Sequence, residues 1–220
     1  MIKISIPLFL WLSSLALSAQ DTTYFGKHGM ANMVLPKKAT RIRIVSELEN
    51  GIQHVEFWQW PRTRLESVQY FKQGDPVGKW IEYNESGEIR SERDFGKLIY
   101  LSCSDPASVP EQDRIIEDTT HVNVMPQFKG GLEELYKFLG RTVRYPREAV
   151  DQGISGKVYI QGKVDATGKW QTKQICLGAH PYLDLAAWQA LDLMPDWEPG
   201  TMDGKPVDVL YQLPVSFTLR

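Results

Sequence analysis

The clearest hydrophobic pattern in the chain lies near its C-terminal end. Apolar and intervening residues alternate there over seven apolar positions: Val207, Val209, Tyr211, Leu213, Val215, Phe217 and Leu219. A period of two places these side chains on one face of a β-strand, so we predict a strand with that face buried. Pro214 falls on the other face and has no amide hydrogen, which favours a position at the edge of a sheet.

Residues 127–220 carry further patterns that predict helices and strands. Gly130 and Gly131 precede apolar residues at helical spacing, namely Leu132, Leu135, Tyr136 and Leu139. Pro181 opens a second predicted helix, whose inward residues are Leu183, Ala187, Ala190, Leu191 and Met194. Between the helices, Val158, Ile160 and Val164 alternate along a strand, and the sequence DATG at 165–168 turns the chain into another strand. This order of elements predicts an α+β domain.

Short aromatic runs separated by turns characterise residues 47–100. The aromatic residues of this segment include Phe57, Trp58, Trp60, Tyr70, Phe71, Trp80, Tyr83 and Phe95. Leu65 and Phe71 recur as Ile89 and Phe95 at one common offset, so we predict a small all-β domain built from hairpin repeats. The aromatic side chains form either the core of this β-meander or an exposed face that binds a glycan or a peptide.

Two other segments lack a clear period. Residues 20–46 are mixed and rich in turn formers, which predicts an irregular segment. Residues 101–126 are rich in serine, proline and mixed polar residues, which predicts a linker between the two domains.

The first 19 residues have the pattern of a secretory signal peptide. A lysine at position 3 precedes an apolar run over residues 4–17, and small residues follow at Ser18 and Ala19. We predict cleavage after one of these two residues and a mature protein in the periplasm or cell envelope. The competing interpretation is an uncleaved membrane anchor, although the run is shorter than the roughly 20 residues that a spanning helix needs.

Composition and charge narrow the function classes. Hydrophobic residues make up 42% and charged residues 24% of the 220 residues, which indicates a folded protein of one or two domains. The formal net charge of −2 argues against a nucleic-acid partner. No histidine or cysteine pair has metal-ligand spacing, and no nucleophile–base signature is visible. We therefore predict a protein that is not an enzyme, with no catalytic residue, metal or cofactor.

Cys103 and Cys176 are the only cysteines in the sequence. In an exported protein they can form one disulfide. Two unpaired thiols, one of them packed as a small hydrophobic residue, are an equally valid interpretation. The sequence does not decide between them.

Ordered motifs in the C-terminal block resemble those of a known family. They are MPQFKGG at 125–131, YP at 145–146, GISGKV at 153–158, DATG at 165–168, MPDWEPG at 194–200 and GKPV at 204–207. Together they resemble the C-terminal domain of TonB energy transducers, in its Met-Pro-x-Phe-x-Gly-Gly form. The resemblance implies two helices on a three-stranded antiparallel sheet.

The resemblance also implies a partner and a contact region. Domains of this family bind the TonB box, a peptide of the plug of a TonB-dependent outer-membrane transporter, which adds a strand to the sheet edge. By resemblance, the predicted partner-binding residues are Tyr145, Pro146, Asp208, Leu210, Gln212 and Ser216. ExbB/ExbD-type motor proteins would be further partners if the N-terminal segment is uncleaved, and a homodimer is left open.

A second resemblance concerns the aromatic segment. The sequence VGKWIEYNESGEI at 77–89 resembles a MORN-type repeat, a hairpin unit found in arrays. The first copy departs from the pattern, because the sequence PRTR at 61–64 occupies the place of a polar-glycine turn.

Two functional hypotheses follow from these patterns. In the first, the protein engages TonB-dependent transporters and supports energy-coupled transport across the outer membrane. In the second, it is an exported interaction module that carries no force. An uncleaved N-terminal anchor favours the first hypothesis, and a cleaved product favours the second.

Overall fold

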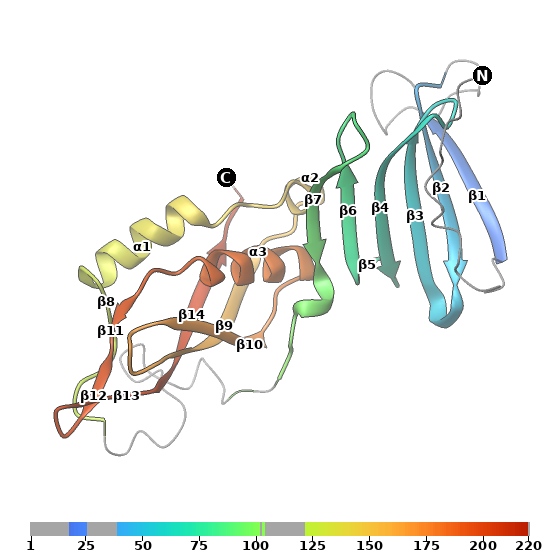
Figure 1. Cartoon of the computed structure of the whole chain (residues 1–220). Coiled ribbons are helices and arrows are strands. Elements are labelled where there is room, and N and C mark those ends of the chain that lie inside the picture. Colours follow the sequence, from blue (N-terminus) through green and yellow to red (C-terminus); the bar gives the residue numbers. More distant parts are fainter. Residues whose placement is uncertain (1–17, 26–38, 102, 104–121, 220) are drawn as a thin grey trace, which may run out of the picture. The chain divides into compact units, whose positions relative to one another are not determined.

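The chain forms two compact units, residues 1–94 and residues 95–220 (Figure 1). The structure is a computed structural model that describes residues 18–25, 39–101, 103 and 122–219. The fold is mixed α/β, with mostly antiparallel sheets and few helices.

The N-terminal unit is one antiparallel sheet of seven strands. Its strands are β1 (Ser18–Phe25), β2 (Arg41–Leu48), β3 (Ile52–Gln59), β4 (Arg64–Lys72), β5 (Asp75–Pro76), β6 (Lys79–Tyr83) and β7 (Ile89–Asp94). The strand order is β1-β2-β3-β4-β6-β7, and β5 pairs with β4. The short 3₁₀ helix η2 (Glu49–Gly51) joins β2 to β3.

Strands occupy more of this unit than the sequence predicted. The predicted β-hairpins downstream of residue 47 are present, and Phe57 and Trp80 are buried in the unit. The prediction of an irregular segment over residues 20–46 is wrong at both of its ends, which belong to β1 and β2; residues 26–38 lie outside the described residues. Ile42 and Ile44 are buried and alternate with arginines along β2, so the period of two was present in the sequence.

The C-terminal unit combines a sheet with helices. Its elements are η3 (Phe95–Lys97), β8 (Gln127–Phe128), α1 (Gly131–Thr142), α2 (Arg147–Asp151), β9 (Gly156–Val164), β10 (Trp170–Leu177), α3 (Pro181–Asp192), β11 (Trp197–Glu198), β12 (Gly200–Met202), β13 (Lys205–Val207) and β14 (Val209–Phe217). The central sheet is antiparallel with the order β10-β9-β14. Two small two-stranded sheets, β11 with β8 and β12 with β13, accompany it.

The core of this unit lies between the central sheet and α3, which packs on β9 and β10. The predicted inward residues of the first strand, Val158, Ile160 and Val164, are fully buried. Leu183 and Leu191 of α3 are fully buried as well. Helix α1 packs on β8, so the predicted layout of two helices on the sheet is supported for α3 and stays a prediction for α1.

Both ends of the predicted linker belong to the C-terminal unit. Residues 99–101 run beside β10, where Ile175 donates its N–H to the carbonyl of Ile99 at 2.7 Å and accepts from Leu101 at 3.2 Å. We call residues 99–101 and Cys103 the strap. At the other end, Val124 and Thr201 exchange two backbone hydrogen bonds. Residues 104–121 of the predicted linker lie outside the described residues.

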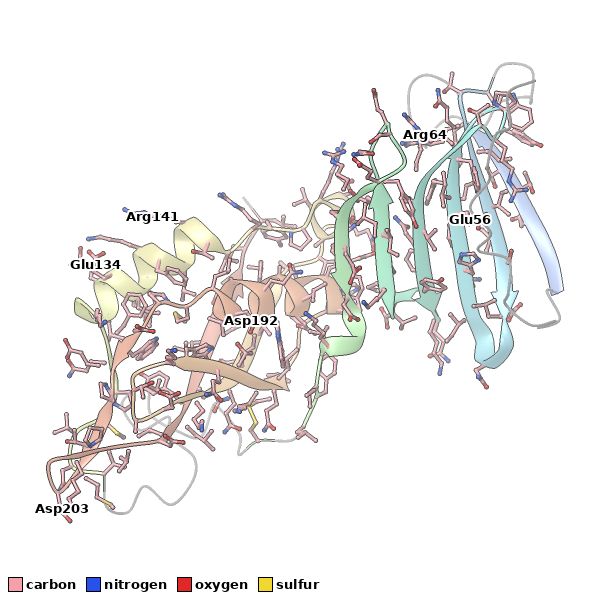
Figure 2. The ribbon with its side chains drawn as sticks, in the orientation of Figure 1. Glu56, Arg64, Glu134, Arg141, Asp192 and Asp203 are labelled. Carbon is pink, nitrogen blue, oxygen red and sulfur yellow. A yellow bond between two sulfur atoms is a disulfide. The ribbon has the colours of Figure 1, made fainter. Side chains whose placement is uncertain are left out.

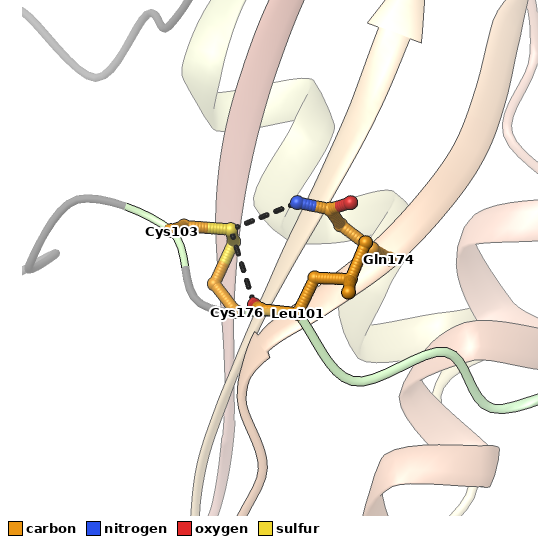
Figure 3. Close-up of a disulfide and its surroundings, with 4 residues drawn as sticks. All are labelled: Leu101, Cys103, Gln174 and Cys176. Carbon is orange, nitrogen blue, oxygen red and sulfur yellow. Dashed lines mark hydrogen bonds between the residues drawn. A yellow bond between two sulfur atoms is a disulfide. The ribbon is translucent and has the colours of Figure 1, made fainter.

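A disulfide closes the strap onto the sheet. Cys103 and Cys176 are bonded, which decides between the two interpretations of the sequence (Figure 3). The amide of Gln174 on β10 donates to the sulfur of Cys103 at 3.2 Å. The strap and the disulfide together cover the β10 edge of the central sheet.

Asp184, in the first turn of α3, anchors the strap from the other side. Its carboxylate is 1% exposed and accepts from the hydroxyl of Tyr100 at 2.8 Å and from the backbone N–H of Ala179 at 2.9 Å. Burial raises the pKa of Asp184, and this effect outweighs the hydrogen bonds that lower it. The folded state therefore holds the proton of Asp184 more tightly than the unfolded chain does.

This arrangement predicts a stability that falls as the pH rises through the titration of Asp184. The loss begins near the unfolded carboxyl pKa of about 4, ends above the raised folded pKa, and has a slope of at most about 1.4 kcal/mol per pH unit. Asp184→Asn removes this titration. Urea unfolding of wild type and variant without reductant should therefore give curves of stability against pH that converge at low pH and separate as the pH rises. Parallel curves would contradict the assignment.

Candidate functional site: an open strand edge beside a groove

Strand β14 forms the open edge of the central sheet. Its residues from Val209 to Phe217 pair without interruption with β9, from Val164 to Gly156. Within the described part of the chain, no other strand pairs with β14, whereas the strap covers the opposite edge at β10. The prediction that this strand lies at a sheet edge is confirmed.

Pro214 determines which backbone groups of β14 face outward. Pro214 lies opposite Tyr159 and cannot donate a hydrogen bond, so this pair is a non-hydrogen-bonded pair of the ladder. The odd-numbered residues from Val209 to Phe217 therefore bond β9, and the even-numbered residues direct their backbone groups to the open edge. The N–H groups of Leu210, Gln212 and Ser216 are therefore available to an added strand.

A groove runs beside this edge, with a volume of about 520 Å³. Residues 125–128 and the first turns of α1 line one side, and residues 211–214 of β14 line the other. The volume lies in the range of small-ligand and peptide-side-chain pockets. The open edge is therefore one wall of a preformed depression.

The apolar face of α1 is divided between core and groove. Leu135 and Leu139 are buried, as their spacing predicted. Leu132 and Tyr136 line the groove and are 60% and 57% exposed. The charged residues Glu134 and Arg141 point away from the sheet (Figure 2). Exposed apolar side chains beside an open strand edge are typical of a binding surface.

An aromatic cluster closes one end of the groove. The ring of Trp197 is 3% exposed and contacts Phe128, Trp170 and Tyr211 at centroid distances of 5.5, 5.8 and 5.4 Å. Trp170 in turn packs over Gly162, where any side chain would collide with its indole. The Nε1–H of Trp197 is buried and has no hydrogen-bond acceptor. The cluster gives this end of the groove a rigid apolar wall.

The predicted site residues Leu210 and Ser216 lie on the open edge strand, and Ser216 is exposed. Asp208 lies just before the strand and is engaged within the domain. Its carboxylate accepts from Lys163 at 2.6 Å and from the N–H of Ala166 at 2.9 Å. The pKa of Asp208 is lowered, chiefly by the hydrogen bond from Lys163 and then by that from Ala166. A direct contact of these residues with a partner stays a prediction.

The side chain of Gln212 is buried, contrary to the sequence prediction. The alternation assigned its side chain to the outer face, yet the residue is only 2% exposed. Its Nε2 is buried without a hydrogen-bond partner. The second face of β14 is therefore covered at this position. The alternation of residues along a strand does not show whether another part of the chain covers that face.

Tyr145 and Pro146 lie at the other end of β14, away from the groove. The ring of Tyr145 packs edge-on against Phe217 at 5.4 Å, and its hydroxyl donates to the carbonyl of Ile154. Pro146 is the N-cap residue of α2. Both residues hold the end of the edge strand in place, and their predicted partner contact stays a prediction.

These features define a small α/β domain that offers one open strand edge and an adjoining apolar groove, the architecture of a peptide-binding module. Residues 141–219 match the sequence model of the Gram-negative bacterial TonB protein C-terminal family, so this part of the chain is a TonB C-terminal domain. The match indicates a TonB-like envelope protein connected with the energy coupling of transport. No curated protein and no solved structure matches the chain.

Two further properties concern the described residues only. Among them, no group of three or more histidine, cysteine, aspartate or glutamate side chains is arranged to hold a metal ion. None of the helices in this part of the chain has the length and hydrophobicity that a membrane crossing requires. The resemblance of residues 77–89 to a MORN-type repeat stays a prediction.

Proposed function

We propose that the C-terminal domain binds the TonB box of a TonB-dependent outer-membrane transporter by adding the peptide as a fourth strand to β14. The observation that carries this proposal is the open edge of β14 with a preformed groove beside it. Backbone hydrogen bonds of an added strand supply affinity, and alternate side chains of the peptide enter the groove. The role is one of binding, without catalysis.

The energetics suit a reversible contact. The outward N–H groups of Leu210, Gln212 and Ser216, with the carbonyls of the same residues and of Pro214, give a handful of hydrogen bonds, each with a net value of about 1 kcal/mol. Association and ordering of a flexible peptide cost several kcal/mol. The resulting affinity is modest, as a coupler that engages and releases its partner requires.

Replacing Ser216 by proline tests strand addition directly. Ser216→Pro removes one outward N–H and places a ring at the open edge, but it removes no hydrogen bond to β9. Ser216 is exposed, so the fold should be retained. We expect affinity for plug-derived TonB-box peptides to fall at least tenfold in fluorescence-polarisation titrations, since the ring also obstructs neighbouring bonds.

Ser216→Ala is the matched control and should bind like wild type. Far-UV circular dichroism and the urea midpoint report whether the proline variant is folded. A folded Ser216→Pro protein with unchanged affinity would exclude strand addition at this edge.

Energy coupling requires a connection to the inner membrane, and this part of the proposal depends on residues 1–17, which lie outside the described residues. We propose a transducer or an auxiliary of one, with ExbB/ExbD-type motor proteins as partners if the N-terminal segment is retained. The N-terminal residue and the membrane fraction of protein from native envelopes distinguish the cases. A soluble protein that begins near Ala19 would favour the interaction module without energy transduction.

A further inference from the structure

Three glutamines form a row across the central sheet. Gln174 on β10 is in register with Gln161 on β9, and Gln161 is in register with Gln212 on β14. Directly opposed residues of adjacent strands lie on the same face, with Cβ atoms about 5 Å apart. The row therefore extends from the strap to the open edge, on the face opposite Leu213 and Val215.

The two ends of the row differ. At the covered edge, the amide of Gln174 donates to the sulfur of Cys103. At the open edge, Gln212 is 2% exposed and its Nε2 has no partner, although Gln161 beside it is also buried. A buried amide donor without an acceptor is a substantial cost to the folded domain, so its retention at this position calls for a use.

An added strand would supply the missing partner. The backbone N–H and C=O of Gln212 face the open edge, so a residue of an added strand lies directly opposite and on the same face of the sheet. We propose that the site selects peptides carrying a side-chain amide, Gln or Asn, at the position opposite Gln212. This proposal rests on the proposed strand addition and names the side chain that it reads.

The chemistry favours an amide over other polar groups. Its carbonyl accepts from Nε2 of Gln212, and its NH₂ donates to the other end of the same carboxamide, so both polar groups are satisfied. A carboxylate in this buried row would carry an uncompensated charge. The residues on either side of the amide lie on the apolar face of Leu213 and Val215, so the selected sequence alternates apolar residues with one amide.

Two matched peptides test this inference. Both are capped, have lysines at the ends for solubility and alternate Val and Thr in between; one carries Gln at a central Thr position and the other Met, which has a similar size but no amide. Shifting the peptide by two residues along β14 keeps each of its side chains on the same face of the sheet. The peptide can therefore change register until its amide lies opposite Gln212. We expect wild type to bind the Gln peptide about tenfold more tightly than the Met peptide.

Gln212→Met supplies the matched protein variant. It removes the unpaired donor and keeps the length of the side chain, so its urea midpoint should be no lower than that of wild type. We expect the variant to bind both peptides with equal affinity. Lys173→Ala, at an exposed position of β10 on the opposite edge of the sheet, is the control and should keep the tenfold preference.

The outcomes separate this inference from the proposed function. Binding of both peptides by wild type with equal affinity overturns the amide selection and leaves strand addition standing. If neither the two test peptides nor the plug-derived peptides bind to wild type, the proposed function itself is overturned. A dimer that forms through β14 and excludes both peptides, seen by analytical ultracentrifugation, overturns both.

Discussion

Loss of the disulfide is expected to lower the unfolding free energy of the C-terminal unit by about 4 kcal/mol. Cys103 and Cys176 are 73 residues apart, and closing a loop of that length removes a large amount of conformational entropy from the unfolded chain. The bond also fastens the strap, whose backbone pairs with Ile175. Cys103→Ser/Cys176→Ser should therefore shift the urea unfolding transition of this unit to lower concentrations.

Reductant provides the matched comparison for this variant. Wild type with reductant should unfold like the double variant, and the double variant should not respond to reductant. If wild type and double variant unfold at the same urea concentration without reductant, the bond contributes nothing to stability.

Gly168→Ala is expected to destabilise the same unit by about 3 kcal/mol. Gly168 has a φ of +86°, and a Cβ atom there would lie 2.1 Å from the carbonyl oxygen of Trp197. The left-handed backbone costs an alanine about 1–2 kcal/mol, and the clash with a backbone atom adds a cost of similar size. Gly168 also accepts the N–H of Trp197 at 2.7 Å, so the clash displaces a wall of the groove.

Gly204→Ala is the control that isolates the clash. Gly204 has a similar φ of +74°, but no atom lies within 4 Å of the position of its Cβ. This variant should lose only about 1 kcal/mol in urea unfolding and should bind peptide like wild type. Equal losses for the two variants would mean that the contact with Trp197 is relieved without cost.

Local patterns in the sequence predicted the main elements of the C-terminal unit, namely α1, α3, β9, β10 and β14. The alternation around Leu213 predicted a strand, and Pro214 predicted its edge position, because both signals depend on the strand itself. The helix at Pro181 and four of its five predicted inward residues followed from spacing alone, whereas Met194 lies beyond the end of α3 and is only partly buried. A helix-forming pattern also predicted the apolar face of α1, but not that Leu132 and Tyr136 border a groove, since spacing does not state what faces them.

Features that depend on pairing between distant segments were not predictable in this way. Cys103 meets Cys176 because the strap pairs with β10, and no local pattern encodes that register. The burial of Gln212 likewise depends on what covers the second face of β14. Strand β2 was missed for another reason. Its local alternation of polar and apolar residues from Arg41 to Ile44 is present in the sequence, but that stretch was assigned to an irregular segment.

The disulfide also determines which part of the chain carries tension. A pull on the chain before Cys103 passes through the sulfur bridge into β10 at Cys176. Residues 104–121 are outside the path of that force, although they were predicted as the linker. Lengthening or shortening that segment would leave unchanged the length of chain between Asp94 and the strap, which meets the sheet at Ile99.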